Sequence, residues 1–238
     1  MKTCIIKQPA GIGDIFFCQK IANKLIEKGF TVIWPIITQF LWVQNYIKNV
    51  QFIDINSTFP YKNEYNNLQI SHCELPHDGI VLNLQGADKY YPTMSVMEAK
   101  YKCFNLEFSD WCDFFNFERN YVKEAELFDN VLKLQNKKYY IKNYFFNSPP
   151  IMQVCNSALN IKDVNLHEVI LQHIDGFTLL DWCKVIENAE KIYTVDTSLA
   201  LIIEKLHTTD QLYMFSKHTP PNFYHVKNLF KKVWIYEC

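Results

Sequence analysis

The sequence predicts an α/β protein in which parallel, doubly wound sheets are covered by helices on both faces. Two observations carry this prediction. Apolar strand patterns alternate with helical patterns from the N-terminus onward, and a second series of the same kind begins after the polar run at residues 136–138. Alternating strands and helices are typical of parallel sheets, because a crossover helix returns the chain to the same edge. We therefore expect two α/β halves, residues 1–138 and residues 139–238.

The first strand ends in a glycine turn. Apolar residues 4–6 lead into Gly11-Ile12-Gly13-Asp14, and apolar side chains then recur at 18, 21, 22, 25 and 26, which is helical spacing. Glycine lets the main chain approach a ligand closely, and the free N–H groups at a helix N-terminus favour an anion. The turn lacks the third glycine of the dinucleotide fingerprint and the Gly-Lys ending of a P-loop. A plain structural turn with Asp14 as a helix cap is the alternative interpretation.

The other elements of the first half follow from the same periods. We predict strands at 30–35 and 50–55, helices at 41–47, from a Ser95-x-x-Glu98 capping box towards 104, and at 121–134, and a polar surface segment at 56–77. The continuous apolar run 79–84 is typical of a central strand buried on both faces. The loop after it should lie beside the glycine turn, at the edge where α/β sheets bind ligands. That loop contributes three candidate cleft residues, Gln85, Gly86 and Asp88.

In the second half the most informative pattern is the strand 191–195. It ends in Asp196-Thr197-Ser198 and is followed by Leu199 and a helix with an apolar face. An acid and two hydroxyls before a helix N-terminus suit an anion, and the same order is also a good helix cap. We further predict strands at 139–146, 151–155, 169–174, 211–216 and 233–236. We also predict helices at 178–186, opened by a Thr178-x-x-Asp181 capping box, and at 221–230. Polar residues that end neighbouring strands are additional cleft candidates: His173, Asp175, Lys217 and His218.

Composition excludes several classes of partner. The formal net charge of -1 and a single arginine, Arg119, give no basic surface for nucleic acid, so the aromatic content of 16% indicates core packing or stacking on a sugar. No apolar run approaches the length of a membrane span, which leaves only peripheral membrane contact open. The eight cysteines form no Cys-x-x-Cys pair and no secretory signal precedes the first strand, so we expect free thiols and a cytoplasmic location. The cluster 72–78 holds His, Cys, Glu and Asp, but without a second ligand pair we predict a polar loop and no metal site.

Two stretches together resemble the heptosyltransferase-like glycosyltransferases of family 9. Residues 11–15, Gly-Ile-Gly-Asp-Ile, are similar to the Gly-Asp turn near the N-terminus of that family. The run 187–198 and the helix after it are similar to its C-terminal donor motif. The resemblance implies the GT-B fold, two Rossmann-like domains facing a cleft. It also implies inverting transfer of a hexosyl or heptosyl group from a nucleotide-sugar to a glycan or other hydroxyl acceptor, without a metal or resident cofactor.

The resemblance also implies roles for individual residues. Asp14 would be the general base that takes the proton of the acceptor hydroxyl. The residues near the donor and its diphosphate would be Gly11, Ile12, Gly13, Asp196, Thr197, Ser198, Leu199 and Lys217.

The chain departs from the family pattern in more than one way. The basic residue that the family has after the first strand of its second domain is not obvious here, because Lys142 lies too deep in its strand. The family motif continues from its acid through Ser-Gly-Pro to a histidine, and here Leu201 stands where that histidine is expected. The alternative function is therefore a catalytically inactive binding or assembly protein that kept the GT-B fold. An α/β hydrolase is disfavoured because no Gly-x-Ser-x-Gly elbow occurs.

Overall fold

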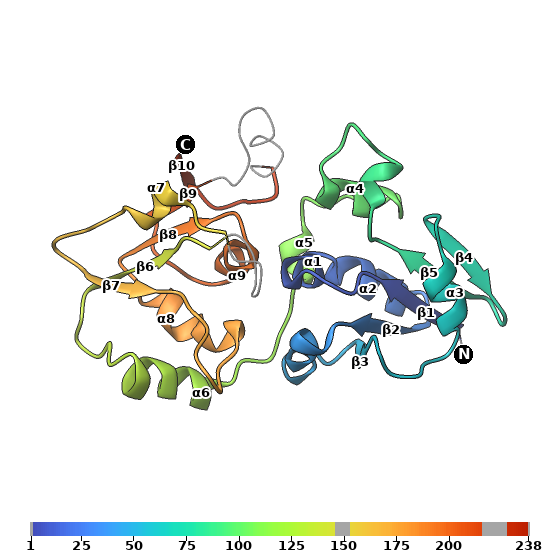
Figure 1. Ribbon diagram of the computed structural model, residues 1–238, viewed down its shortest axis with the longest axis horizontal. Coiled ribbons are helices and arrows are strands. Elements are labelled where there is room, and N and C mark those ends of the chain that lie inside the picture. Colours follow the sequence, from blue (N-terminus) through green and yellow to red (C-terminus); the bar gives the residue numbers. More distant parts are fainter. Residues whose placement is uncertain (1, 146–152, 216–227, 238) are drawn as a thin grey trace. The chain divides into compact units, whose positions relative to one another are not determined.

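The computed structural model describes residues 2–145, 153–215 and 228–237. The chain divides into two compact units, Met1–Glu118 and Arg119–Cys238, and each contains its own five-stranded sheet with helices (Figure 1). The predicted fold class, α/β with two parallel-dominated sheets, is confirmed. No helix in the described ranges is long and apolar enough to cross a bilayer.

The sheet of the first unit has the strand order β3-β2-β1-β5-β4. Its central strand β1 pairs in parallel with β2 and β5, in a register that sets Ile5 beside Ile33 and Val81. Cys4, Ile5 and Ile6 are fully buried because a central strand is covered on both faces. The strands are β1 (Lys2–Lys7), β2 (Phe30–Ile36), β3 (Gln51–Asp54), β4 (His72–Leu75) and β5 (Gly79–Asn83).

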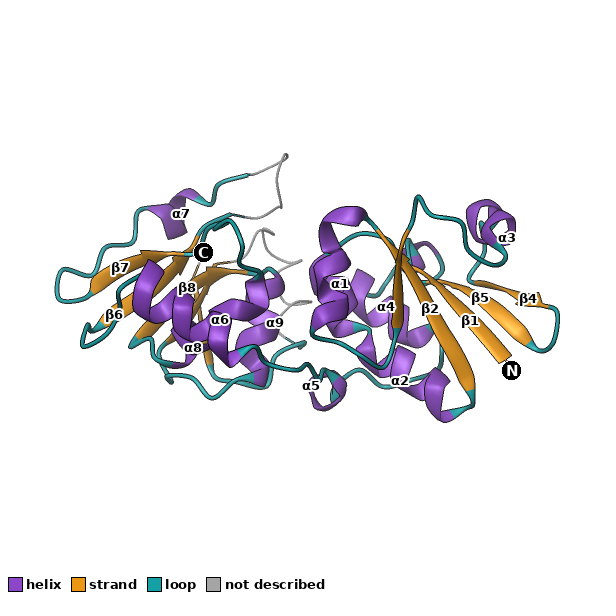
Figure 2. Ribbon diagram, turned by 90° about the horizontal axis from the view of Figure 1, so that it is seen from below, coloured by secondary structure: helices purple, strands orange, loops and turns teal. Residues whose placement is uncertain are grey.

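Helices α2 and α3 lie on opposite sides of these strands (Figure 2). On the α3 side, Tyr65 belongs to one apolar cluster with Ile5, Ile33 and Val81. The helical pattern expected through residues 18–26 is interrupted at Cys18, where α1 ends and α2 begins. The helical segments are α1 (Ile12–Phe17), α2 (Gln19–Glu27), the 3-10 helix η1 (Thr38–Asn45), α3 (Lys62–Asn67), the 3-10 helix η2 (Ala87–Lys89), α4 (Val96–Lys102) and α5 (Trp111–Phe114).

The segment 56–77 differs from the predicted irregular surface, since it contains α3 and β4. Strand β4 pairs antiparallel with β5 at the sheet edge, and His77 and Asp78 take positive φ in the turn between them. His72 and Glu74 are exposed and only Leu75 is buried, so no apolar run marks this strand in the sequence. Short edge strands with polar side chains are common because they discourage pairing between molecules.

The sheet of the second unit has the order β10-β9-β8-β6-β7, and every pair is parallel. The strands are β6 (Tyr139–Asn143), β7 (His167–Ile170), β8 (Lys191–Val195), β9 (Leu212–Phe215) and β10 (Trp234–Glu237). The helical segments are α6 (Tyr121–Ala125), the π-helical turn η3 (Glu126–Val131), α7 (Asn156–Leu159), the 3-10 helix η4 (Leu179–Trp182), α8 (Cys183–Glu187) and α9 (Ser198–Lys205). The strand expected at 151–155 is not formed by residues 153–155, where Val154 makes an isolated bridge to Phe145. Most of the helix expected at 221–230 lies outside the described residues.

The division between the units falls at Glu118/Arg119, earlier than the expected boundary at 138/139. Segment 119–138 packs within the second unit: Phe128 lies against the ring of Tyr139, at 6.2 Å between centroids. Arg119 donates paired hydrogen bonds to Glu124 and to Glu187 at the end of α8. The hydrogen bonds from Arg119 to Glu124 are the main cause that raises the pKa of Arg119 above its usual range. The polar run 136–138 is therefore a connection inside the second unit.

Candidate functional site

The glycine turn after β1 places Asp14 in the first turn of α1. Gly11 has φ +88°, a conformation that side chains disfavour, and its carbonyl accepts a hydrogen bond from Ile15 N–H at 3.1 Å. A Cβ atom on Gly11 would overlap Asp14 Oδ2, so the carboxylate occupies the space that the missing side chain leaves. The Asp14 side chain is 25% exposed. The turn thus presents a solvent-accessible carboxylate at the carboxyl edge of the sheet, where the sequence places it.

Lys100 of α4 binds this carboxylate. Its ammonium forms an ion pair with Asp14 Oδ1 and donates a hydrogen bond of 2.7 Å to Gln8 Oε1. Gln8 in turn donates from Nε2 to the Ala10 carbonyl at 2.6 Å. The Lys100 side chain is 2% exposed, and Gln8 is also buried. Asp14, Lys100 and Gln8 form one polar network at the glycine turn.

Sequence reasoning missed Lys100 and Gln8. The signal for Lys100 was available: in the helix opened by the Ser95-x-x-Glu98 box, Lys100 follows Met97 by three residues and precedes Phe104 by four, which places it on the apolar face. A lysine on a buried face needs a charged or polar partner. Which residue is that partner depends on how distant elements pack, and a local sequence pattern does not predict this packing.

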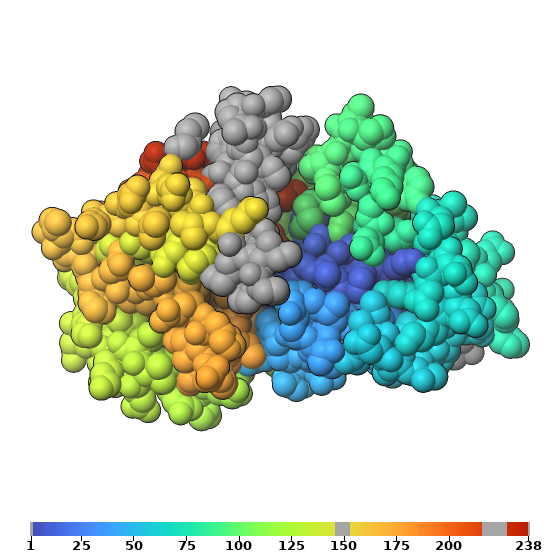
Figure 3. Space-filling view, in the orientation of Figure 1, coloured from blue at the N-terminus to red at the C-terminus, as the bar shows by residue number. Residues whose placement is uncertain are grey.

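Helix α4 is fixed independently of Lys100. The predicted capping box is present, with Ser95 Oγ accepting from Glu98 N–H at 3.3 Å and Glu98 accepting from Ser95 N–H at 3.1 Å. Tyr101 donates its hydroxyl to the Phe17 carbonyl at 2.5 Å, and the two rings pack edge to face. In the space-filling view the green surface around α4 lies against the dark blue surface of the first elements (Figure 3). This packing brings Lys100 to the glycine turn.

Cys18 is another ionisable group near this network. It is fully buried at the junction of α1 and α2. Burial raises the pKa of the Cys18 thiol to about 12, with smaller effects from Lys100 and Asp14. Cys18 therefore stays protonated and acts as a packing residue, which agrees with its place on the apolar stripe of the sequence.

The loop after β5 is tied to the same edge. Leu84 N–H and Gln85 N–H both donate to the Lys7 carbonyl at 3.1 Å, directly before Gln8. Gly86 has φ +74° and starts η2, which contains Asp88. The structure thus brings the predicted residues Gln85, Gly86 and Asp88 to the strand end that carries the glycine turn.

In the second unit, the turn after β8 is organised by a residue that sequence reasoning missed. Asn143 at the end of β6 donates from Nδ2 to Thr194 Oγ1 at 3.0 Å and to Thr197 Oγ1 at 3.1 Å. Asp196 N–H donates to the Phe215 carbonyl of β9 at 3.3 Å. Thr197 occupies the cap position of α9 without a side-chain capping bond. Asp196 is buried, while Thr197 and Ser198 are half-buried.

Leu199 and Leu201 are core residues of α9. Leu199 is fully buried and Leu201 is 4% exposed. A contact of Leu199 with a ligand is therefore limited to its main chain. The apolar Leu201 fills space in the core at the position where the family motif has histidine.

Two of the remaining predicted residues of the second unit are described by the structure. His173 and Asp175 lie in the exposed loop after β7, where His173 Nε2 and Asp175 Oδ1 are 3.1 Å apart. Lys123 of α6 donates to the Gly176 carbonyl at 2.7 Å and anchors this loop towards α6. Lys217 and His218 lie outside the described residues.

Lys142 is a structural residue, as its depth in the strand predicts. Its side chain is 5% exposed and forms an ion pair with Glu168. Its ammonium also donates to the carbonyls of Leu159 and Ile161, each at 3.2 Å. With these partners Lys142 ties α7 and β7 to β6.

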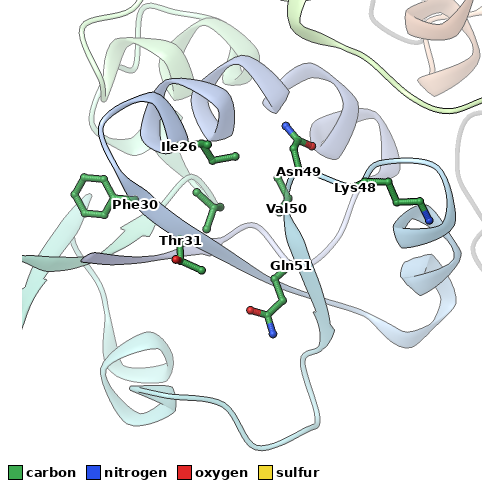
Figure 4. Close-up of a pocket in the computed structure, with 8 residues that line it drawn as sticks. Ile26, Phe30, Thr31, Lys48, Asn49, Val50 and Gln51 are labelled. Atoms are coloured by element: carbon green, nitrogen blue, oxygen red, sulfur yellow. The ribbon is translucent and has the colours of Figure 1, made fainter. Parts of the chain in front are cut away.

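A depression of about 360 Å³ lies elsewhere on the first unit, at the N-terminal ends of β2 and β3 (Figure 4). Figure 4 shows its lining side chains, which come from the end of α2 and from the two strand starts: Ile26, Phe30, Thr31, Val32, Lys48, Asn49, Val50 and Gln51. It contains none of the predicted site residues. Among the residues the structure describes, no three His, Cys, Asp or Glu side chains are grouped to hold a metal ion.

No protein-family model and no curated protein sequence matches this chain. Solved structures do. A glycosyl transferase of family 9 from Veillonella parvula aligns with a TM-score of 0.59 and 10% identity, over 99% of this chain and 86% of that one. The bacterial iron-containing dodecameric glycosyltransferase TibC from enterotoxigenic E. coli aligns with a TM-score of 0.51 and 6% identity, over 100% of this chain and 64% of that one. The E. coli heptosyltransferase WaaC with ADP-2-deoxy-2-fluoro heptose aligns with a TM-score of 0.47 and 12% identity, over 99% of this chain and 92% of that one.

These identities show the fold alone. The chain shares its fold with the family 9 glycosyl transferase from Veillonella parvula, which agrees with the fold that the resemblance implied. The two parallel-dominated α/β units are the architecture that the resemblance implied.

Proposed function

From the premise of a family 9 glycosyltransferase fold, we propose that this protein transfers a sugar from a nucleotide-sugar donor to a hydroxyl acceptor. The observation that carries the proposal is the Asp14 carboxylate, partly exposed in the first turn of α1 with one oxygen held by Lys100. A carboxylate in this position suits a general base. The likeness of fold suggests the class of reaction, and the Asp14 carboxylate is the proposed proton acceptor.

In the proposed reaction Asp14 Oδ2 accepts the proton of the acceptor hydroxyl. The acceptor oxygen forms a bond to the anomeric carbon as the bond from that carbon to the donor phosphate breaks. Attack from the face opposite the leaving group inverts the anomeric configuration. The nucleoside diphosphate leaves with the electron pair of the broken bond, and the proton remains on Asp14.

We assign the donor diphosphate to the turn that begins α9. The N–H groups at the start of this eight-residue helix and the hydroxyls of Thr197 and Ser198 suit phosphate oxygens. Asp196 would contact the nucleoside, and the main chain of Gly11, Ile12 and Gly13 would approach the sugar. The proposal includes no metal and no resident cofactor, and it keeps Lys217 as the basic candidate for the diphosphate.

A cytoplasmic location is part of the proposal. The cysteines that the structure describes are all free thiols, which suits a reducing compartment. The acceptor class is a glycan or another hydroxyl compound, and the transferred group is a hexose or heptose.

One observation favours a second function, a catalytically inactive binding or assembly protein. Leu201 stands where the family motif has histidine, and it is an apolar side chain buried in the core of α9. It cannot take over a polar role of that histidine. A protein that lost the reaction would retain the fold and lose the response to donors.

A thermal-shift panel of UDP-, GDP-, ADP- and CMP-sugars separates the two functions. A donor at about 100 times its Kd stabilises the folded state by about 2.7 kcal/mol, so one nucleotide class should raise the Tm. Turnover is then measured with the responding donor. Asp14→Asn should lower kcat by about 100- to 10,000-fold and leave the donor-induced shift in place.

The matched control is Asp78→Asn, in the exposed turn between β4 and β5, where asparagine tolerates the positive φ. This variant should keep full turnover. No response to any donor would favour the binding protein, and unchanged turnover in Asp14→Asn would remove Asp14 as the base.

A further inference from the structure

Burial of the charged Lys100 ammonium costs free energy, and other contacts already hold α4 in place. An ammonium removed from water needs partners, and the partners recorded for Lys100 are the Asp14 carboxylate and the Gln8 amide oxygen. The helix is already fixed by its capping box and by the hydrogen bond from Tyr101 to Phe17. The buried charge therefore has its main effect on the glycine turn.

The effect on Asp14 is orientational. Lys100 holds Oδ1, and Oδ2 lies over the Cα of Gly11, where the absence of a Cβ leaves room for it. Gln8 links the same ammonium to the Ala10 carbonyl, one residue before Gly11. Trp34 supports this segment by donating its indole N–H to the Gln8 carbonyl at 2.9 Å. One carboxylate oxygen is thus bound in the protein while the side chain stays partly exposed.

We infer that Lys100, supported by Gln8, is the positioning residue that fixes the Asp14 carboxylate so that Oδ2 receives the acceptor proton. The inference rests on the proposed function and goes beyond it, because it assigns a role to a residue of α4. When the proton moves from the acceptor oxygen to Oδ2, Oδ1 retains its hydrogen bond from Lys100. The carboxyl group then remains in place for the return of the proton to solvent.

The first test is kinetic. Lys100→Met keeps the length and apolar stem of the side chain and removes the charge, so Asp14 is free to rotate. We expect kcat to fall about 100-fold, as for a displaced reacting group, while KM for the donor changes less than about twofold. Partial loss of the fold would also lower the apparent kcat without changing KM, so kcat is calculated per folded molecule, with the folded fraction taken from the amplitude of the thermal transition.

Two lysine variants serve as controls. Lys20 is 7% exposed in its side chain, pairs with Asp110 and donates to the Glu107 carbonyl at 2.6 Å, so Lys20→Met also removes a buried lysine from an ion pair with a partly exposed carboxylate. It should lower Tm as Lys100→Met does and retain kcat. Lys102→Met changes an exposed lysine of the same helix and should alter neither property. Equal kcat in Lys100→Met and Lys20→Met overturns the inference.

A second measurement does not need turnover. The Lys100 ammonium, buried and doubly hydrogen-bonded, should give a slowly exchanging side-chain ¹⁵N signal in NMR spectra of the whole protein. Asp14→Asn should shift or abolish that signal, and Asp78→Asn should leave it unchanged. A missing signal in the wild type, or one insensitive to Asp14→Asn, overturns the ion pair itself.

The failures are distinguishable. If the wild type turns over no donor, the proposed function fails and this role fails with it, whatever the NMR signal shows. If the wild type is active and Lys100→Met is equally active, only the role of Lys100 fails.

Discussion

At Gly11 the lack of a side chain determines where the Asp14 carboxylate lies. The residue has φ +88°, and a Cβ there would overlap Asp14 Oδ2. The glycine and the acid were both visible in the sequence as a motif. They occur together because the glycine has no side chain and the carboxylate of Asp14 fills the space that this leaves.

We expect Gly11→Ala to act on this contact at the residue scale. Alanine at positive φ costs about 1–3 kcal/mol, and the clash in addition displaces Asp14 from Lys100. Stability should fall and turnover should be largely lost. Chemical unfolding and initial rates measure the two effects.

Gly29→Ala is the matched control. Gly29 has φ +82°, and a Cβ there would meet nothing within 4 Å, so this variant carries the backbone cost without the clash. It should lose stability and keep turnover. Equal stability losses in the two variants, with full turnover in Gly11→Ala, would contradict the proposed geometry.

At the scale of elements, η3 and α8 are joined by an ion pair whose strength depends on pH. Lys184 of α8 donates to Asp129 Oδ2 of η3 at 2.9 Å, and its ammonium lies 4.6 Å from the centre of the Phe128 ring. The hydrogen bond from Lys184 lowers the pKa of Asp129 from its usual value. A carboxyl group whose pKa is lower in the folded state than in the unfolded one stabilises the fold while it is ionised.

Asp129→Asn should therefore be less stable than the wild type at neutral pH. The stabilisation is present above the unfolded-state pKa, about 3.9, and is lost as the pH falls through the lower folded-state pKa. The difference between the two proteins should shrink below about pH 3.9, as measured by urea unfolding at a series of pH values. The exposed Asp210 offers a control, since Asp210→Asn should follow the wild type; a difference for Asp129→Asn that is constant with pH would contradict the assignment.

At the scale of the whole molecule, the division at Glu118/Arg119 assigns α6 and η3 to the second unit. These segments contribute buried Leu127 and Phe128, and each large apolar side chain stabilises a fold by about 1.5–3 kcal/mol when fully buried. A fragment of residues 119–238 should therefore unfold with a cooperative thermal transition. A fragment of residues 139–238 should lack one, because Tyr139 would lose the ring of Phe128 that packs against it.

Circular dichroism during heating measures this difference. The complementary fragment 1–118 is the control for the first unit and should contain its complete sheet. Equally cooperative transitions for fragments 119–238 and 139–238 would show that the boundary at 138/139 is adequate.

The sequence by itself determined the alternation of strands and helices, the buried central strands, the capping boxes at Ser95 and Thr178, and the glycine turn with Asp14. These features depend on neighbours a few residues apart, whose periods and turn chemistry can be read locally. Only the tertiary structure decided which distant side chains meet. Lys100 reaches Asp14 across 86 positions, and Arg119 reaches Glu187 across 68. A buried charge needs a partner, but the packing of whole elements determines which residue that partner is. The same packing determines the residues around the candidate base and the boundary of the second unit.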